Sequence, residues 1–222
     1  MQKIAIVTGS SSGIGEAIAK RLLQLEYVVY GVSRSCSITH EHYTHLEYDL
    51  IEKIPTEVKK IDVSLLVNCA GFGVFEPHEQ ISEKTISDMC DLNIKAPITL
   101  TNMTLRALKK NEGTIINITS IEATRSAKFS ALYSATKSAL KAFSASLFEE
   151  VRKDGVNVVS INPDMTETPF FDKLKFKASS KDEKALLAED IADAVENILG
   201  MRDGANITDL TIRSKKFGII KK

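Results

Sequence analysis

The sequence has little of what marks several classes of protein. It has three cysteines among 222 residues and no C-x-x-C pair, which argues against a disulfide framework, a metal ribbon and a dithiol redox couple. Its 29 lysines and arginines balance 29 aspartates and glutamates, so no charge footprint favours a nucleic-acid backbone or an anionic membrane. We therefore expect neither nucleic acid nor a membrane among its partners.

Long apolar runs are missing as well. No stretch of about 18 apolar residues occurs, and an apolar strand follows Met1-Gln2-Lys3 directly, without the apolar region of a signal peptide. Hydrophobic residues make up 43% and charged residues 26% of the chain, which are the proportions of a folded globular protein. These features predict a soluble, cytoplasmic protein whose residues 1–222 form a single domain without a linker or repeat.

Short β-branched segments alternate with amphipathic ones along the chain. Strands are predicted at 4–7, 27–32, 45–48, 64–67, 114–118, 156–161 and 207–212, and helices at 16–25, 52–60, 82–110, 130–153 and 188–199. Parallel strands need crossover connections, so this alternation predicts about seven parallel strands with helices on both faces. The predicted fold class is a doubly wound parallel α/β sheet, a Rossmann fold.

A glycine-rich turn joins the first strand to the first helix. Glycine permits a positive φ and lets the backbone approach a pyrophosphate closely. The helix N-terminus after the turn presents unpaired N–H groups to an anion. The G-x-x-x-G-x-G spacing therefore predicts a dinucleotide phosphate site, made by Gly9, Ser11, Ser12, Gly13, Ile14 and Gly15.

Three polar residues predict an acid–base site. Tyr133 and Lys137 are four residues apart on a predicted helix, so both project from one face. An ammonium near a phenol favours the phenolate and lowers the tyrosine pKa from its usual value of about 10. Ser120 follows a predicted strand, at the edge where α/β sheets bind ligands.

The order and spacing of these motifs resemble those of the short-chain dehydrogenase/reductase family. The matching residues are T-G-x-x-x-G-I-G at 8–15, Asp49-Leu50, N-x-A-G at 68–71, Asn93, Ser120, Y-x-x-x-K at 133–137 and Asn162-Pro163. The resemblance covers essentially the whole chain. It is specific for the fold and the cofactor class, and far less specific for the substrate.

The resemblance implies a role for each of four catalytic residues. Tyr133 would protonate a carbonyl oxygen during reduction, or act as the base in the reverse direction. Lys137 would lower the pKa of Tyr133 and bind the nicotinamide ribose, and Ser120 would stabilise charge on the substrate oxygen. Asn93 would hold a water that connects Lys137 to solvent. The alternative for Asn93 is a helix-kink residue near Pro97.

The resemblance also implies cofactor contacts beyond the glycine turn. These contacts are Ser33, Arg34, Asp49, Leu50, Asn68, Ala70, Gly71, Tyr133, Lys137, Pro163, Thr166 and Thr168.

Three positions depart from the family pattern. Cys69 replaces the second asparagine of N-N-A-G, and we interpret it as a buried small side chain rather than a reactive thiol. Asp164 replaces a glycine next to the nicotinamide, which adds a Cβ and a negative charge there. Glu26 replaces a common glycine after the first helix, a change expected to affect only the turn.

The end of the second predicted strand bears on the choice of nicotinamide. Family members that prefer NAD usually have an acidic residue there, whereas this chain has Ser33 followed by Arg34. A guanidinium matches a 2′-phosphate in charge and geometry. A second basic residue common before Gly13 is absent, because Ser12 stands there. We predict NADP(H) over NAD(H), with Arg34 as a solvated loop cation the alternative.

The substrate side of the site leaves several alternatives open. Arg125 or Lys128, with Glu122 nearby, would bind an anionic substrate group or else remain solvated loop charges. A short substrate lid is expected around 164–188, with 166–178 as its mobile piece. An apolar pocket wall, or part of the core, is predicted for Phe72, Phe129, Met165, Phe170 and Phe171.

No metal site is predicted. His40, His42 and His45 lie near Cys36, but their spacing is unlike that of zinc ligands. We expect these histidines on the solvated adenine side of the sheet.

The function predicted from the sequence is hydride transfer between NADP(H) and a small-molecule carbonyl or alcohol. Two alternatives stay open: a nucleotide-binding regulator that has lost turnover, and a dehydratase or epimerase on the same fold. The helices over 97–110 and 130–153 resemble those that form oligomer interfaces in the family, so a homodimer or homotetramer is expected.

Overall fold

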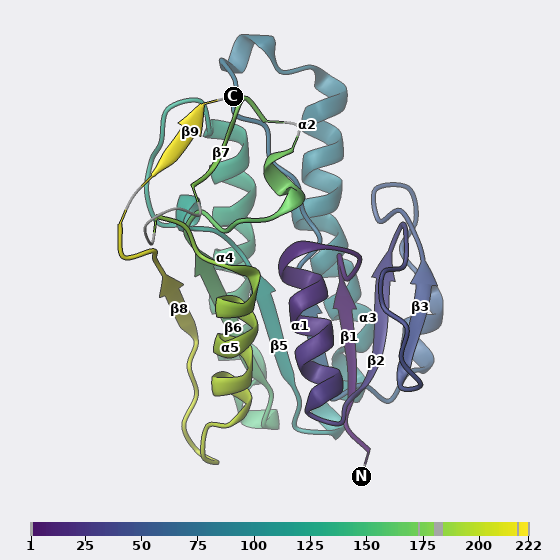
Figure 1. Cartoon of the computed structure of the whole chain (residues 1–222). Helices are drawn as coiled ribbons and strands as arrows, with labels where there is room; N and C mark the ends of the chain where they lie inside the picture. Colours follow the sequence, from purple (N-terminus) through teal and green to yellow (C-terminus); the bar gives the residue numbers. More distant parts are fainter. Residues whose placement is uncertain (1, 173, 180–183, 217, 222) are drawn as a thin grey trace.

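Seven parallel strands form the central sheet in the computed structural model, which describes residues 2–172, 174–179, 184–216 and 218–221. They are β1 (Ile4–Thr8), β2 (Val28–Ser33), β3 (Tyr43–Glu47), β4 (Leu65–Asn68), β5 (Thr114–Ile118), β6 (Asn157–Pro163) and β8 (Asp209–Ile212). Their order is β3-β2-β1-β4-β5-β6-β8, and every neighbouring pair is parallel (Figure 1). The predicted doubly wound α/β fold is confirmed.

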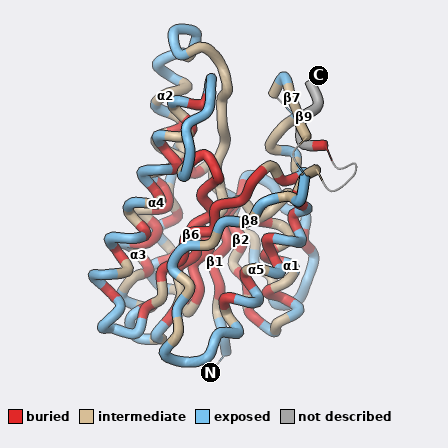
Figure 2. The backbone as a smooth tube through the Cα atoms, turned by 90° about the vertical axis from the view of Figure 1, so that its left-hand side faces the viewer, coloured by how far each residue is buried: buried red, intermediate tan, exposed pale blue. Residues whose placement is uncertain are grey.

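Helices cover both faces of this sheet. Helices α1 (Gly13–Gln24) and α5 (Ala188–Leu199) pack together on one face, and α3 (Ala96–Lys110) and α4 (Ala131–Val151) lie on the other. Figure 2 shows the buried strands between these two helical layers. The chain adds β2 and β3 on one side of β1 and then continues with β4 on the other side, so the order in which strands are added reverses between β1 and β4. Ligands of α/β folds bind beyond the strand ends at such a point. No helix in the described ranges has the length and apolarity needed to cross a membrane.

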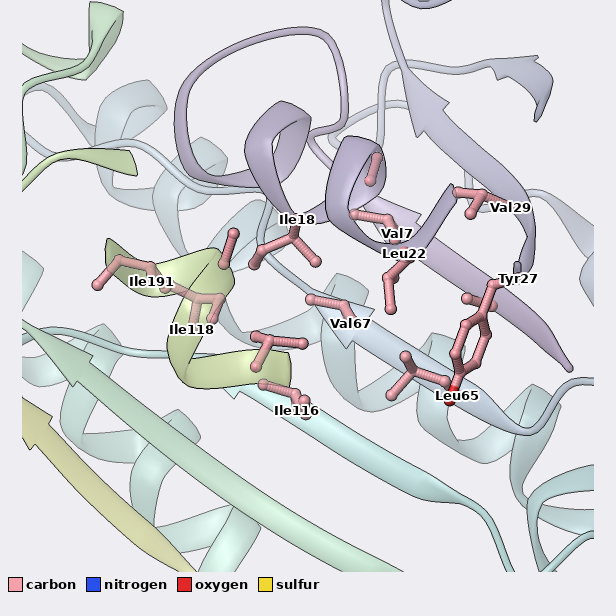
Figure 3. Close-up of a cluster of buried hydrophobic side chains, with 14 of the residues drawn as sticks. Val7, Ile18, Leu22, Tyr27, Val29, Leu65, Val67, Ile116, Ile118 and Ile191 are labelled. Atoms are coloured by element: carbon pink, nitrogen blue, oxygen red, sulfur yellow. The ribbon is translucent and has the colours of Figure 1, made fainter. Parts of the chain in front are cut away.

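Two apolar cores hold the layers together. The first packs α1 and α5 onto the sheet through fully buried side chains that include Ile18, Leu22 and Ile191 (Figure 3). The second, on the opposite face, includes Leu66, Leu100 and Leu108. Both faces of the strands are therefore buried, which explains why β1, β4 and β5 are continuous β-branched and aliphatic runs rather than alternating ones.

The predicted helix over 82–110 is helical throughout but is not one regular α-helix. It consists of α2 (Glu83–Cys90), a π-helical turn (Asp91–Lys95) and α3, with Pro97 in the first turn of α3. Pro97 lacks the N–H of a helical hydrogen bond, and a proline and a π-turn are both known causes of a helix kink. The π-turn contains Asn93, so this residue lies at an irregularity of the helix, as the kink alternative expected, and such irregularities are frequent at functional sites.

The other predicted boundaries differ mainly at two helices. Helix α1 begins at Gly13, three residues before the predicted start at 16, so the last residues of the glycine turn belong to the first turn of the helix. The predicted helical piece over 52–60 is only a 3-10 turn (Thr56–Lys60) after Pro55. The helix predicted over 130–153 ends as α4 at Val151 and a 3-10 turn (Arg152–Asp154), and Gly155 closes it at φ 75°. Further 3-10 turns are His78–Gln80, Ile121–Ala123 and Pro169–Phe171.

A small antiparallel sheet was not predicted. Strands β7 (Phe176–Ala178) and β9 (Ile219–Lys221) pair at the end of the molecule where the sheet strands terminate (Figure 1). Strands of three residues are too short for the alternation of apolar and polar residues to be recognised in the sequence. The pairing connects the expected lid to the C-terminal segment. Residues 173 and 180–183 of that lid lie outside the described residues.

The turn after α1 holds Glu26 in a left-handed conformation, with φ 61°. This conformation costs an ordinary residue roughly 1–2 kcal/mol, whereas glycine adopts it freely but loses about 0.5–1 kcal/mol more conformational entropy on folding. The difference leaves a net strain at Glu26 that glycine would remove.

We predict that Glu26→Gly stabilises the fold by roughly 0.5–1 kcal/mol, measured as a higher urea midpoint at unchanged m value. Glu26→Ala is the matched control, because it removes the carboxylate and keeps the strained backbone. Equal stabilisation by both variants would show that side-chain charge, not backbone conformation, is the cause.

Candidate active site

One cavity of about 1060 Å³ lies at the carboxyl ends of the central strands and contains nearly all the predicted site residues. It is lined by Gly9, Ser11, Ser12, Gly13, Ile14, Gly15, Ser33, Arg34, Asp49, Leu50, Ala70, Gly71, Ser120, Tyr133, Lys137, Pro163, Thr166 and Thr168. Two predicted residues, Asn68 and Asn93, are not part of this lining.

The glycine turn makes a backbone cradle at one end of the cavity. Gly9 and Gly13 have φ of 69° and 57°, and a Cβ on Gly15 would collide with the Gly9 carbonyl. A Cβ on Gly13 would lie 3.1 Å from the Thr168 side chain. The Ser12 side chain does not cap α1, so the first-turn N–H groups stay available to an anion. These features fit a dinucleotide pyrophosphate.

The end of β2 carries the residues expected to distinguish the nicotinamides. The Arg34 side chain is 77% exposed and lies 3.8 Å from Asp49. The Ser33 hydroxyl donates to the Ser35 carbonyl at 2.8 Å and lies 3.2 Å from His45 Nε2. The histidine that the sequence left without a role therefore supports Ser33, because the parallel pairing of β2 and β3 brings the two together.

Tyr133 and Ser120 come together from α4 and the end of β5. Burial raises the pKa of the Tyr133 hydroxyl well above its ordinary value. A hydrogen bond with the Ser120 side chain opposes this rise in pKa, and the nearby Glu122 charge adds to it. Tyr133 is therefore a neutral hydrogen-bond donor at physiological pH.

Lys137 is buried one helical turn beyond Tyr133. Its Nζ donates to the Ile118 carbonyl at 2.9 Å and lies 5.8 Å from the centroid of the Tyr133 ring. Burial lowers the pKa of Lys137 to about 8. The expectation that Lys137 would lower the Tyr133 pKa is wrong for this structure, since burial dominates and moves the tyrosine pKa upward.

Asn93 positions other groups instead of facing the cavity. Its amide accepts from Phe72 N at 3.1 Å, donates to Phe72 O at 2.9 Å and donates to Thr136 Oγ1 at 3.0 Å. The π-turn that holds Asn93 is thereby fixed both to the loop after β4 and to α4, next to Lys137. Asn93 is 1% exposed.

Asn68 also points away from the cavity. Its Nδ2 donates to Asn117 Oδ1 at 2.8 Å, and Asn117 donates to Ser144 Oγ at 2.8 Å. This buried chain connects β4, β5 and α4, so Asn68 would reach a cofactor only through its backbone. Cys69 beside it is half-buried and lines the cavity rather than lying fully in the core, and burial raises the pKa of its thiol to about 12, which disfavours the reactive thiolate.

Ion pairs occupy the charged groups at the substrate end. Arg125 donates from Nε and Nη2 to Glu122 Oε1 at 3.0 and 2.9 Å. Asp164, with its side chain 2% exposed, accepts from Arg213 at 3.2 Å and lies 3.9 Å from Arg125. Arg125, whose side chain is 37% exposed, is thus paired with a carboxylate. Arg213 was missed because β8 brings it here from far along the chain.

The apolar wall differs in part from the predicted one. Phe129, Met165, Phe170 and Phe171 line the cavity, but Phe72 does not. Phe75 and Phe176 line it as well. The sequence offered no signal for Phe75, which lies in an irregular loop, or for Phe176, whose strand is only three residues long.

The histidines near Cys36 do not converge. His45 contacts Ser33, whereas His40 and His42 are exposed and pair with each other through ring and backbone contacts. In the part of the chain that the structure describes, no three His, Cys, Asp or Glu side chains are grouped as metal ligands.

We predict a pH-dependent stability cost from Lys137. Its folded-state pKa of about 8 lies below the ordinary 10.5, so between these values the unfolded chain binds more protons and wild-type stability rises with pH. Lys137→Met removes this contribution. Its stability relative to wild type should therefore fall by roughly 3 kcal/mol between pH 7 and pH 11, as measured by urea unfolding at several pH values. Parallel curves for the two proteins would contradict the burial of a titrating ammonium.

Comparison with known proteins agrees with this geometry. The family model described as short chain dehydrogenase matches residues 3–178. An uncharacterized oxidoreductase of Staphylococcus epidermidis is 33% identical over 96% of this chain and 97% of its own length. A similar relative in Staphylococcus aureus is 34% identical, covering 95% and 96%.

Solved structures share the fold over the whole chain. An alcohol dehydrogenase of the archaeon Thermococcus sibiricus, complexed with 5-hydroxy-NADP, has a TM-score of 0.82 at 25% identity, with 97% of each chain covered. A 4-hydroxyisoleucine dehydrogenase complexed with NADH has a TM-score of 0.81 at 21% identity, covering 96% and 98%, and shows the fold alone. By the family match and the full-length relatives, this chain belongs to the short-chain dehydrogenase family of oxidoreductases.

Proposed function

We propose that this protein interconverts a small-molecule carbonyl compound and its alcohol, with NADP(H) as the preferred cofactor. The observation that carries the proposal is the Tyr133 hydroxyl beside Ser120, in the same cavity as the glycine cradle. A nicotinamide dinucleotide bound there would supply the hydride for reduction or accept it in oxidation. The protein would provide orientation, water exclusion and the proton.

Tyr133 is suited to give a proton to the carbonyl oxygen. Its pKa is raised by burial, so the phenol keeps its proton at neutral pH and loses it only to a strongly basic oxygen. The oxygen of a carbonyl becomes such a base as it gains alkoxide character during reduction. The raised pKa therefore supports Tyr133 as the proton donor when the carbonyl is reduced.

Ser120 and Lys137 would stabilise the charge that develops in this step. The Ser120 side chain lines the cavity together with Tyr133, and its hydroxyl would donate to the same substrate oxygen. With a pKa of about 8, Lys137 is mostly charged at neutral pH and offsets the negative charge left on Tyr133. Asn93 acts as a positioning residue through Phe72 and Thr136.

The preference for NADP(H) rests on Arg34. Its exposed guanidinium stands at the end of β2 and lines the cavity, where a 2′-phosphate would displace the weak 3.8 Å pairing with Asp49. Position 33 itself carries no carboxylate, and the Asp49 carboxylate lies against the Arg34 guanidinium. Ser33 would contribute less, because its hydroxyl already donates to Ser35.

We predict that Tyr133→Phe lowers kcat for carbonyl reduction by roughly 10²–10⁴-fold, because the general acid is lost. NADPH affinity, measured by titration of the cofactor fluorescence, should not change. Retained turnover would exclude Tyr133 as the proton donor. Tight NADPH binding by the wild type with no turnover of aldehydes, ketones, diketones or quinones would instead favour a nucleotide-binding regulator.

We predict that Arg34→Asp reverses the cofactor preference. Loss of a charge-assisted hydrogen bond worth about 1.5–3 kcal/mol should lower the ratio of kcat/KM for NADPH over NADH by roughly 10- to 100-fold. Arg34→Lys, which keeps the positive charge, is the control and should preserve the direction of the preference. An unchanged ratio in Arg34→Asp would refute the phosphate-binding role.

A further inference from the structure

Four phenylalanines and Tyr133 form a closed ring of aromatic contacts, which we call the aromatic cage. Its centroid distances are Phe75–Tyr133 5.2 Å, Tyr133–Phe170 5.8 Å, Phe170–Phe171 5.2 Å, Phe171–Phe176 5.8 Å and Phe176–Phe75 5.2 Å. These separations and the tilted or edge-on orientations are those that attract aromatic pairs. The cage therefore holds together segments that are distant in the sequence.

The cage forms part of the cavity wall around the Tyr133 ring. Tyr133 is one of its members, and all five rings line the cavity. A Cβ on Gly73 would lie 2.9–3.0 Å from ring atoms of Phe170, Phe75 and Tyr133, so the glycine lets the loop after β4 pack against these rings. A substrate whose carbonyl reaches Tyr133 must place its neighbouring group against phenylalanine rings.

Three cationic groups near the cage are paired with carboxylates. Arg125 is paired with Glu122, Arg213 with Asp164, and Lys175 with Glu76 at 3.5 Å. The Lys128 ammonium lies 4.8 Å from the centroid of the Phe129 ring, at the cavity rim.

An anionic substrate would compete with these carboxylates for the paired cations and would desolvate its own charge against aromatic rings. Both steps cost free energy. A neutral apolar group has neither cost and gains from burial.

We propose that the substrate is a neutral carbonyl compound with an aryl or similarly flat apolar group next to the carbonyl, held by the aromatic cage. This inference rests on the proposed function and specifies its substrate class. A ketone with a carboxylate in the same place would be a poor substrate. So would one with only a methyl group, because it leaves the rings uncovered.

Three ketones that share the CH3–CO–CO– or CH3–CO– unit test this inference. They are 1-phenyl-1,2-propanedione, 2,3-butanedione and pyruvate, which place a phenyl, a methyl and a carboxylate group at the cage. With NADPH, we expect the phenyl compound to exceed the methyl compound in kcat/KM by roughly 10-fold or more, and pyruvate to be the poorest. A phenyl-to-methyl ratio near one, or a preference for pyruvate, would overturn the inference while leaving the oxidoreductase function in place.

Variants separate the effect of the cage from the intrinsic reactivity of the ketones. Phe176→Leu should lower the phenyl-to-methyl ratio at least several-fold, and Phe75→Leu serves the same purpose from a different element if the first variant does not fold. Phe148→Leu is the matched control, since Phe148 lies on α4 near Arg152, away from the cavity lining, and its ratio should equal that of wild type. An unchanged ratio in the folded cage variants would overturn the inference.

A binding experiment distinguishes failure of this inference from failure of the proposed function. Acetophenone and 2-butanone cannot react with protein loaded with NADP+, so their affinities are measured by calorimetry without turnover. Tighter acetophenone binding supports the cage even if no ketone is reduced, in which case only the proposed reaction fails. Equal affinities would overturn the cage as a recognition site, whether or not reduction occurs.

Discussion

Burial of Tyr133 and Lys137 at the carboxyl edge of the sheet is the constraint on which the rest of this site depends. Removing both groups from water keeps the phenol protonated and brings the lysine pKa to about 8. A buried ammonium destabilises the fold, and its hydrogen bond to Ile118 offsets only part of that cost. The buried asparagines around it belong to the same arrangement, because Asn93 and Asn117 fix the π-turn, β5 and α4 so that both side chains are held in place.

Acidic side chains around the site are paired with arginines, and the whole chain likewise carries no net charge. Glu122 and Asp164 would each disfavour an alkoxide or phenolate nearby, but Arg125 and Arg213 pair with them. The carboxylate of Asp164, where the family has glycine, is thus accommodated by Arg213, which directly follows β8. What remains open toward the substrate is mostly aromatic, so selection there depends on shape and apolar contact more than on charge.

Sequence reasoning predicted the fold closely, and the strand boundaries agree with the structure within two residues. It was less accurate where local preference and tertiary contact compete. The helical piece predicted over 52–60 is only a 3-10 turn after Pro55. The predicted helix through Asn93 contains a π-turn, because the Asn93 amide bonds to the loop after β4. In the site, the turn at Gly9–Gly15 and the Tyr133–Lys137 pair lie where expected, whereas Asn68 faces the interior. Arg213 and Phe176 were missed, because only the folding of the C-terminal third brings them to the cavity.

The sequence by itself determined the sheet, the glycine turn proposed to bind phosphate and the candidate acid–base residues. Each depends on a few consecutive residues: β-branched runs, glycines that allow a positive φ, and side chains one helical turn apart. Only the tertiary structure decided the direction of the Tyr133 pKa, the pairing of Arg125 and the closure of the aromatic cage. Desolvation, ion pairing and ring contacts arise between segments distant in the chain, so their balance is set only when those segments pack together.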